Sequence, residues 1–318
     1  MKKACQKKTK IKKSLIIAII FGLLSLMVGL RRTSAQTNQR TFTISPPTIN
    51  FNLEPGKSEE KTIKITNNSA EPMTFVIGIQ DFIVNDNSGT PELLPSGFKP
   101  DNKYAASTWA TAYPELVTVQ PGKTATTTLY LRVPGNARPG GKYISLTLRP
   151  LSSDSPDGSG AAVSTVIGTL AYITVAGDVE EKAQIISFTA PTLSEYGPIP
   201  FNTEIKNLGD LHINPKATVE VKNLFGKKVH SFALDNLNIF PGTSRIYENN
   251  WETKWLFGRY TANLSGYYGQ NNQLNLVALA SFWVIPYKLI AIVLLATALV
   301  LITAFYLKKR NEPQEIEE

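Results

Sequence analysis

The sequence predicts an all-β protein of two tandem sandwich domains followed by one C-terminal transmembrane helix. From Thr41 onwards, short runs in which every second residue is apolar alternate with Pro-Gly and Asn turns, a pattern typical of antiparallel sheets. No helical period interrupts this pattern before residue 289. Residues 289–307 are nineteen residues without charge, Gly or Pro, and as a helix they would be roughly 28 Å long, enough to cross the hydrocarbon layer.

The first 35 residues have the composition of a secretory signal peptide. Seven lysines lie in residues 1–13, an apolar run follows over residues 14–30, and small residues precede a cleavage point between Ala35 and Gln36. Because the apolar run is long and two arginines follow it, an uncleaved signal anchor is an open alternative. In both cases we expect the residues that follow to be exported.

Residues 36–177 are expected to form the first sandwich. Segments such as 62–66 and 127–133 have an apolar residue at every second position, which indicates strands with one buried face. Pro-Gly and Asn pairs between such segments mark the turns. The stretch 151–162 is rich in Gly and Ser, and we expect it to form a mobile hairpin loop.

Residues 183–284 are expected to form a second sandwich, because they repeat features of the first in the same order. The corresponding segments are 65–69 and 205–209, 119–122 and 239–242, and 141–143 and 258–260. In the last pair a tyrosine follows Gly and a basic residue, as at the tyrosine corner of Ig-like domains. We therefore predict that Tyr143 and Tyr260 each open a penultimate strand and that both sandwiches are Ig-like.

The run 289–307 is the predicted membrane anchor, and residues 308–318 are the predicted cytoplasmic tail. Lys and Arg are retained on the cytoplasmic side, and Trp and Tyr favour the two interfaces. The residues expected to fix the helix in the membrane are Trp283, Tyr287, Tyr306, Lys308, Lys309 and Arg310. We thus expect a single-pass protein of the cell membrane with both sandwiches extracellular. A buried helix of a soluble domain is the alternative.

Composition argues against nucleic-acid binding, metal binding and catalysis. The chain has 33 Lys and Arg against 25 Asp and Glu, but the basic excess lies near the two ends, and the ectodomain is formally neutral. The single cysteine, Cys5, precedes the first apolar run, so no disulfide or thiolate site is expected in the exported part of the protein. His212 and His230 lack metal-ligand spacing, and no catalytic motif occurs. We expect no enzyme, metal or cofactor.

Trp109 and Tyr113 are the candidate ligand-binding residues. They lie in a segment with several bulky residues, and an exposed aromatic pair of this kind offers a stacking surface to a sugar ring. The alternative is that Trp109 is a core tryptophan between the two sheets. The sequence leaves both interpretations open.

Several segments of the first domain resemble those of the WxL-interacting proteins of Gram-positive surfaces. These segments are Pro55-Gly56, 62–69, Glu71-Pro72, Gln80-Asp81-Phe82, 107–109, 119–122 and 139–143. The resemblance covers about residues 41–175, and over 183–284 it is mostly one of architecture. It implies a protein facing the cell wall, whose first domain binds peptidoglycan and whose second domain contacts surface proteins. These motifs mark turns and strand starts, so they specify a fold more than a ligand.

The expected function is therefore that of a non-catalytic, membrane-anchored adhesion or scaffold protein that binds cell-wall polymer, surface proteins or both. The alternative is an assembly factor or chaperone that lends an open sheet edge to a secreted subunit by β-strand addition. The edges of the first sandwich distinguish the two, because Pro and charges block strand pairing whereas a long bare apolar edge invites it.

Overall fold

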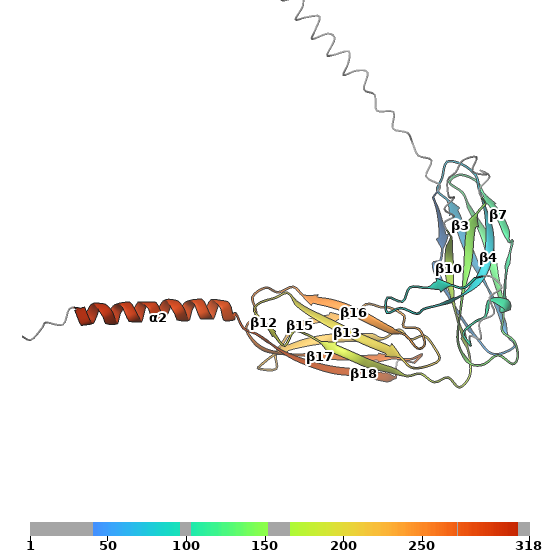
Figure 1. Cartoon of the computed structure of the whole chain (residues 1–318). Helices are drawn as coiled ribbons and strands as arrows, with labels where there is room; N and C mark the ends of the chain where they lie inside the picture. The colour runs from blue at the N-terminus through green and yellow to red at the C-terminus, as the bar shows by residue number, and fades with distance from the viewer. Residues whose placement is uncertain (1–40, 96–102, 152–165, 272, 311–318) are drawn as a thin grey trace, which may run out of the picture. The chain divides into compact units, whose positions relative to one another are not determined.

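The computed structural model describes residues 41–95, 103–151, 166–271 and 273–310, and the side chains of Lys309 and Arg310 are not among the features described (Figure 1). The predicted signal peptide with its cleavage point at Ala35 and Gln36, most of the predicted loop 151–162, and the tail beyond Arg310 lie outside the described residues. Residues from Phe42 onwards cluster as one compact unit.

Two sheets form what we call the first sandwich. One sheet has the order β1 (Phe42–Ser45), β3 (Ser58–Asn67), β8 (Thr124–Arg132) and β6 (Ala110–Tyr113). The other has the order β2 (Thr48–Leu53), β10 (Ile167–Val175), β9 (Gly140–Pro150), β4 (Met73–Ile83) and β5 (Glu92–Leu93), with β7 (Leu116–Val119) also paired to β4. All neighbours are antiparallel except β2 and β10, which are parallel.

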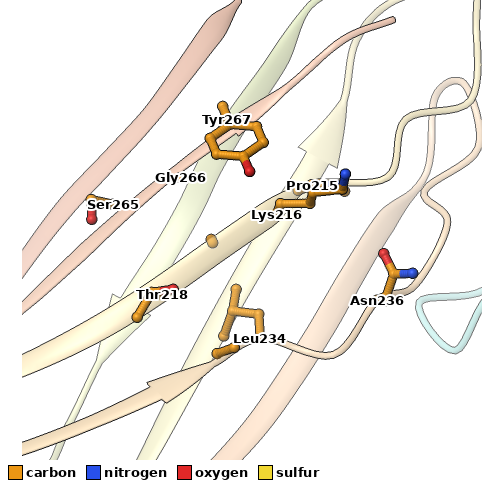
Figure 2. Close-up of a pocket in the computed structure, with 10 residues that line it drawn as sticks. Pro215, Lys216, Thr218, Leu234, Asn236, Ser265, Gly266 and Tyr267 are labelled. Carbon is orange, nitrogen blue, oxygen red and sulfur yellow. The ribbon is translucent and has the colours of Figure 1, made fainter. Parts of the chain in front are cut away.

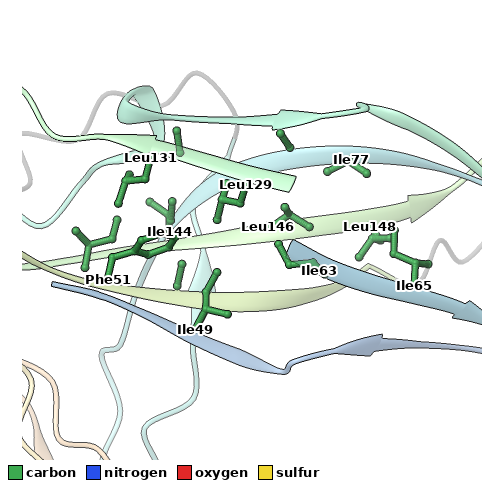
Figure 3. Packing of buried hydrophobic residues seen from close by; sticks show 14 of the residues in the cluster. Ile49, Phe51, Ile63, Ile65, Ile77, Leu129, Leu131, Ile144, Leu146 and Leu148 are labelled. Carbon is green, nitrogen blue, oxygen red and sulfur yellow. The ribbon is translucent and has the colours of Figure 1, made fainter. Parts of the chain in front are cut away.

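The core of the first sandwich lies between these two sheets (Figure 3). Ile63 of β3 and Leu129 of β8 come from one sheet, while Phe51 of β2 and Leu146 of β9 come from the other, and all four are fully buried. Since side chains alternate between the two faces of a strand, the predicted period of two places every second residue in this core. The predicted strand 62–66 is therefore confirmed, and the predicted strand 127–133 is confirmed as far as Arg132.

Two further sheets form the second sandwich. One has the order β11 (Ala183–Thr189), β13 (Ile199–Asn207) and β16 (Ser244–Trp251). The other has the order β12 (Leu193–Ser194), β18 (Leu274–Val284), β17 (Gly258–Tyr268), β14 (Lys216–Asn223) and β15 (Lys228–Ala233). Phe201, Val219 and Phe282 are fully buried between them. The two separate cores fall on either side of the predicted boundary at 176–182. The Ig-like assignment of each sandwich stays a prediction.

One buried asparagine at the end of a strand occupies the same place in each sandwich. The Asn67 amide nitrogen donates to the carbonyl oxygens of Glu71 (2.7 Å) and Val119 (2.9 Å). The Asn207 amide nitrogen donates to those of Leu211 (2.7 Å) and Ile239 (2.9 Å).

The backbone around these asparagines is also alike. The Gly122 N–H donates to the Asn67 carbonyl, and the Gly242 N–H donates to the Asn207 carbonyl, each at 2.9 Å. Each asparagine therefore ties its strand to a Pro-Gly turn far along the chain, which explains why these two features repeat together in the sequence. Because Asn67 is fully buried, the segment Asn67-Asn68-Ser69 is a structural turn.

The two predicted corner tyrosines differ from each other. The Tyr260 hydroxyl donates to the Phe257 carbonyl at 3.1 Å, a bond to backbone shortly upstream that is typical of a tyrosine corner. The Tyr143 hydroxyl instead accepts the N–H of His212 at 2.9 Å, so it contacts the loop before β14. Both open long strands that precede the last strand of their sandwich, as predicted.

The C-terminal helix α2 (Tyr287–Arg310) is longer than the predicted 289–307. It begins directly after Pro286, and polar residues extend it at both ends because a helix continues into the interfacial region as readily as through the apolar one. The Thr297 and Thr303 hydroxyls donate to carbonyls of their own helix, so neither needs water. Among the described residues, α2 is the one helix long and apolar enough to cross a membrane.

Candidate functional site

The candidate residue Trp109 is held in place by a buried carboxylate. Trp109 ends the short 3-10 helix η1 (Ser107–Trp109), which precedes β6. Asp81 of β4 accepts the N–H groups of Ala106 (2.7 Å) and Ser107 (2.8 Å) and the Ser107 hydroxyl (2.5 Å). The Asp81 side chain thus satisfies donors that the helix start would otherwise leave unpaired, and it holds η1, which ends at Trp109, against β4.

Trp109 fits both interpretations that the sequence left open. Its side chain is half-buried and packs against the core of the first sandwich. The buried Lys142 amine lies 5.9 Å from the ring centroid, and burial lowers the pKa of this amine. Trp109 also lines a groove on the outside of the sheet.

This groove, which we call the aromatic groove, has a volume of about 540 Å³. Its lining residues are Ser58, Glu59, Glu60, Thr108, Trp109, Thr111, Tyr130, Leu131 and Arg132. Strand pairing builds it, because Glu60 of β3 pairs with Tyr130 of β8, and Tyr130 pairs with Thr111 of β6. These three side chains therefore share the outer face of the sheet.

Tyr113 extends the aromatic surface beyond the groove. It lies two residues after Thr111 and pairs with Thr128, so its ring is on the same outer face and diagonal to Tyr130. Tyr113 is 73% exposed and Tyr130 is 43% exposed. The face therefore presents two accessible rings, with the hydroxyl groups of Thr111 and Thr128 beside them.

The outer face of this sheet has the composition of a binding surface. Exposed rings offer apolar faces for stacking, while hydroxyl groups and the flanking Glu60 and Arg132 offer hydrogen bonds. Such a surface fits a ligand that is apolar on one face and hydroxylated at its edge.

A second hollow of about 610 Å³ lies in the second sandwich (Figure 2). It is lined by residues of β14 and β17 and by Leu234 and Asn236 after β15. A Cβ at Gly266 would lie 2.5 Å from that of Ala217, so β14 and β17 approach closely beside this hollow. Neither Trp109 nor Tyr113 belongs to this hollow, and it contains one basic side chain, Lys216.

The histidines have structural surroundings. The His212 ring lies among aromatic rings, 5.7 Å from Tyr143, 5.2 Å from Tyr172 and 6.3 Å from Phe240 between centroids. The His230 ring stacks on Trp251 at 5.4 Å. Among the described residues, no three His, Cys, Asp or Glu side chains are grouped to hold a metal ion.

We expect His212 to make the protein less stable in acid. Burial lowers its pKa from the usual 6.5 to about 4, so the folded state disfavours the proton that the unfolded state accepts. Stability is therefore lost as pH falls from about 6.5 to about 4, by up to about 3 kcal/mol. Between pH 7 and pH 4.5, the melting temperature of the wild type should therefore fall more than that of His212→Gln, which lacks the titrating ring. Parallel pH profiles would contradict this expectation.

The edges of the first sandwich are mostly short and closed by proline. Strands β1 and β6 have four residues each, and Pro46 and Pro114 follow them directly. Strand β2 is different, with six uncharged residues, and none of the strands that the structure describes pairs with its outer side. Its exposed side chains, Thr48, Asn50 and Asn52, are polar, so β2 is open to pairing without being a bare apolar edge.

Comparison with known proteins gives similarity of fold alone. No family model and no curated protein matches the chain. Solved structures that resemble it include the class 5 fimbriae chaperone CfaA, with 15% identity, a TM-score of 0.40, and coverage of 76% of this chain and 99% of that one. The YadV chaperone has 9% identity and a TM-score of 0.37, with coverage of 76% and 99%. At these values the likeness carries no functional inference, and the resemblance to WxL-interacting proteins stays a prediction.

Sequence reasoning identified part of this site. It named Trp109 and Tyr113, and the structure places both along one sheet, with Tyr113 exposed and Trp109 half-buried. It missed Tyr130, which pairs with Thr111. The sequence does contain a signal for Tyr130. In this strand apolar and polar residues alternate, and Tyr130 lies at a solvent-facing position where a polar residue is expected.

Proposed function

We propose that the protein is a non-catalytic surface protein, anchored by α2, whose first sandwich binds an extended, hydroxyl-rich cell-wall polymer. The observation that carries this proposal is the pair of exposed rings, Tyr113 and Tyr130, on one sheet face beside the aromatic groove. Peptidoglycan is the polymer that the family resemblance implies, and its sugar rings have the required chemistry.

Sugar rings match this face for a physical reason. One side of a pyranose ring is largely C–H, which stacks on an aromatic ring, while its hydroxyl groups lie at the edge and need hydrogen bonds. Tyr113 and Tyr130 lie on neighbouring strands, so two successive sugar rings can each meet one aromatic ring. The polar edge of the polymer then faces Thr111 and Thr128.

The anchor gives this binding a location. We propose that α2 spans the cell membrane, with Trp283 (45% exposed) and Tyr287 at the outer interface and Tyr306 and Lys308 at the inner one. Lys309 and Arg310 complete the basic end, so the sandwiches face the wall. The C-terminal tail is then cytoplasmic.

Sedimentation of the full chain with purified insoluble cell wall tests the proposal. The protein, held in a mild detergent, should pellet with the wall and should be released by soluble wall fragments, because binding is to the polymer itself. As a comparison, the full chain is immobilised and the secreted proteins that it captures are measured. If the chain stays in the supernatant while secreted proteins are captured, the wall-binding proposal is wrong.

A second candidate function is capture of a secreted subunit by β-strand addition at β2. The favouring observation is that β2 has six uncharged residues and that no strand within residues 41–95, 103–151, 166–271 and 273–310 pairs with its outer side. Main-chain hydrogen bonds from an incoming strand would satisfy the free N–H and C=O groups of this edge. Among the structures similar in fold, one is a complex of the SafB chaperone with the SafA pilin, but the proposal for this chain rests on the edge alone.

Charge on β2 separates the two candidate functions. We expect the variant Asn50→Lys/Asn52→Lys to lose any captured subunit, since edge lysines oppose strand pairing. Its sedimentation with cell wall should not change, because β2 belongs to the other sheet from Tyr113 and Tyr130. Both amounts are measured by quantitative immunoblot. Equal loss of both ligands would contradict the separation of the two sites.

A further inference from the structure

The end of the second sandwich that bears α2 carries exposed apolar side chains at the tips of its loops. Strand register defines this end without ambiguity. Ile199 pairs with Trp251, Gly258 pairs with Val284, and Asn223 pairs with Tyr260. The turn after β14, the loop after β16 and the loop before β13 therefore lie at the same end as the last residue before the helix.

Each of these three loops exposes large apolar residues. In the turn after β14, Phe225 is 90% exposed and Leu224 is also exposed. In the loop after β16, Trp255 is 75% and Phe257 is 71% exposed. In β12 and the loop that joins it to β13, Leu193 and Tyr196 are exposed as well. Soluble surfaces rarely gather such side chains, and a group of them marks a contact site.

The loops are tied to the chain just before the helix. The Trp283 N–H donates to the Thr192 carbonyl and the Ile285 N–H to the Ser194 carbonyl, both at 2.9 Å. The Gly197 N–H donates to the Lys254 carbonyl at 3.0 Å, which links the two longer loops. These two loops therefore cannot move far from residue 285, and the turn after β14 is held at the same end by the pairing of Asn223 with Tyr260.

The length of the connector fixes the distance to the lipid. Only Ile285 and Pro286 lie between β18 and α2, and two extended residues span about 7 Å. The outer interface of a bilayer is a layer several ångströms deep, in which Trp, Phe and Leu side chains are stable and basic side chains meet lipid phosphates. Loops bonded to residues 283 and 285 are within reach of that layer.

Charge at this end also fits lipid headgroups. Lys227 and Lys254 lie in the same loops as Phe225 and Trp255, and Arg259 lies at the start of β17. The Lys254 amine is 5.8 Å from the Trp255 ring centroid, and the Lys288 amine pairs with Glu195 at 2.9 Å. Aromatic side chains beside amines are the composition of a membrane interface.

We propose that these three loops, which we call the loop rim, insert into the outer lipid interface and seat the second sandwich on the bilayer. The proposal rests on the proposed membrane anchor and adds a second, peripheral contact to it. The helix alone would leave the sandwich free to tilt about its two-residue connector. The loop rim restrains this tilt, because several points of contact replace one.

Site-specific labels on the full chain in lipid vesicles test this inference. The exported part has no cysteine, so Phe225→Cys and Trp255→Cys, made in a Cys5→Ser background, each give one labelling site for a fluorophore. The matched control is Tyr267→Cys, because Tyr267 is exposed but pairs with Lys216 at the opposite end of the sandwich. Lipids with a nitroxide near the headgroup quench only labels that lie at the interface.

We expect labels at 225 and 255 to be quenched several-fold more than the label at 267. Flotation of the vesicles reports on the anchor separately, since α2 alone should carry all three variants with the lipid. If the protein does not float, the membrane anchor is wrong. If it floats but the labels at 225 and 255 are quenched no more than the label at 267, the anchor stands and the loop rim does not enter the lipid.

Discussion

Replacing Asn67 with alanine is expected to lower the free energy of unfolding by about 3–4 kcal/mol. The Asn67 side chain is fully buried, and its amide donates to two carbonyl oxygens. Its oxygen also accepts the N–H (2.9 Å) and the hydroxyl (2.5 Å) of Ser69. Alanine removes all four hydrogen bonds, and the bond to the Val119 carbonyl is fully buried. Loss of a buried hydrogen bond costs about 1–3 kcal/mol, and each of the partly buried bonds adds a smaller amount. Chemical denaturation of the exported chain measures the loss.

Asn68→Ala is the matched control for this prediction. Asn68 is the next residue, is exposed, and makes one surface hydrogen bond to the Thr43 hydroxyl at 3.2 Å. Its replacement should change stability by less than about 0.5 kcal/mol. Asn207→Ala should resemble Asn67→Ala, because Asn207 makes the equivalent bonds in the second sandwich. Equal effects of Asn67→Ala and Asn68→Ala would contradict the structural role given to the buried amide.

Removing both exposed rings of the candidate site is expected to have the largest effect on binding. The double variant Tyr113→Ala/Tyr130→Ala should lower the affinity for cell-wall polymer at least tenfold, since an aromatic residue central to a contact typically contributes more than about 1 kcal/mol. Exposed side chains contribute little to the core, so the melting temperature should change little. Sedimentation of the full chain over a range of wall concentrations gives the affinity.

Tyr267→Ala is the control for the binding prediction. Tyr267 has nearly the same exposure as Tyr130 but lies in the second sandwich, beside the hollow of Figure 2. Its replacement should leave wall binding unchanged. If the affinity falls equally in Tyr113→Ala/Tyr130→Ala and in Tyr267→Ala, wall binding depends on surface tyrosines in general. The face of the first sandwich would then have no special role.

Much of the fold was predictable because strand periodicity and turn chemistry are local signals. The repeat of Asn67 and Asn207 with the turns at 119–122 and 239–242 predicted two copies of one architecture, and the structure shows the same hydrogen bonds at both places. That these amides are buried was not predictable, because the bonds join residues more than thirty positions apart. Asparagine in a turn has the same sequence signature whether it is buried or exposed.

In the candidate site, too, local sequence predicted some residues, whereas others depend on contacts between distant segments. Trp109 and Tyr113 could be predicted from the sequence because they are bulky residues in one short segment. Tyr130 joins them only through the register of β6 and β8, which no local pattern specifies. Likewise, Phe225 and Trp255 are thirty residues apart, and only strand pairing shows that their loops share one end with α2.

Hydroxyl-radical footprinting of the full chain, with and without cell-wall polymer, tests the central claim most directly. Exposed aromatic side chains are the reporters, so the intact protein needs no substitution. The proposed function predicts that Tyr113 and Tyr130 become protected when polymer is added, while Tyr267 and Phe225 in the second sandwich do not change. Protection of Tyr267 or Phe225 with no change at Tyr113 and Tyr130 would contradict the assignment of wall binding to the first sandwich.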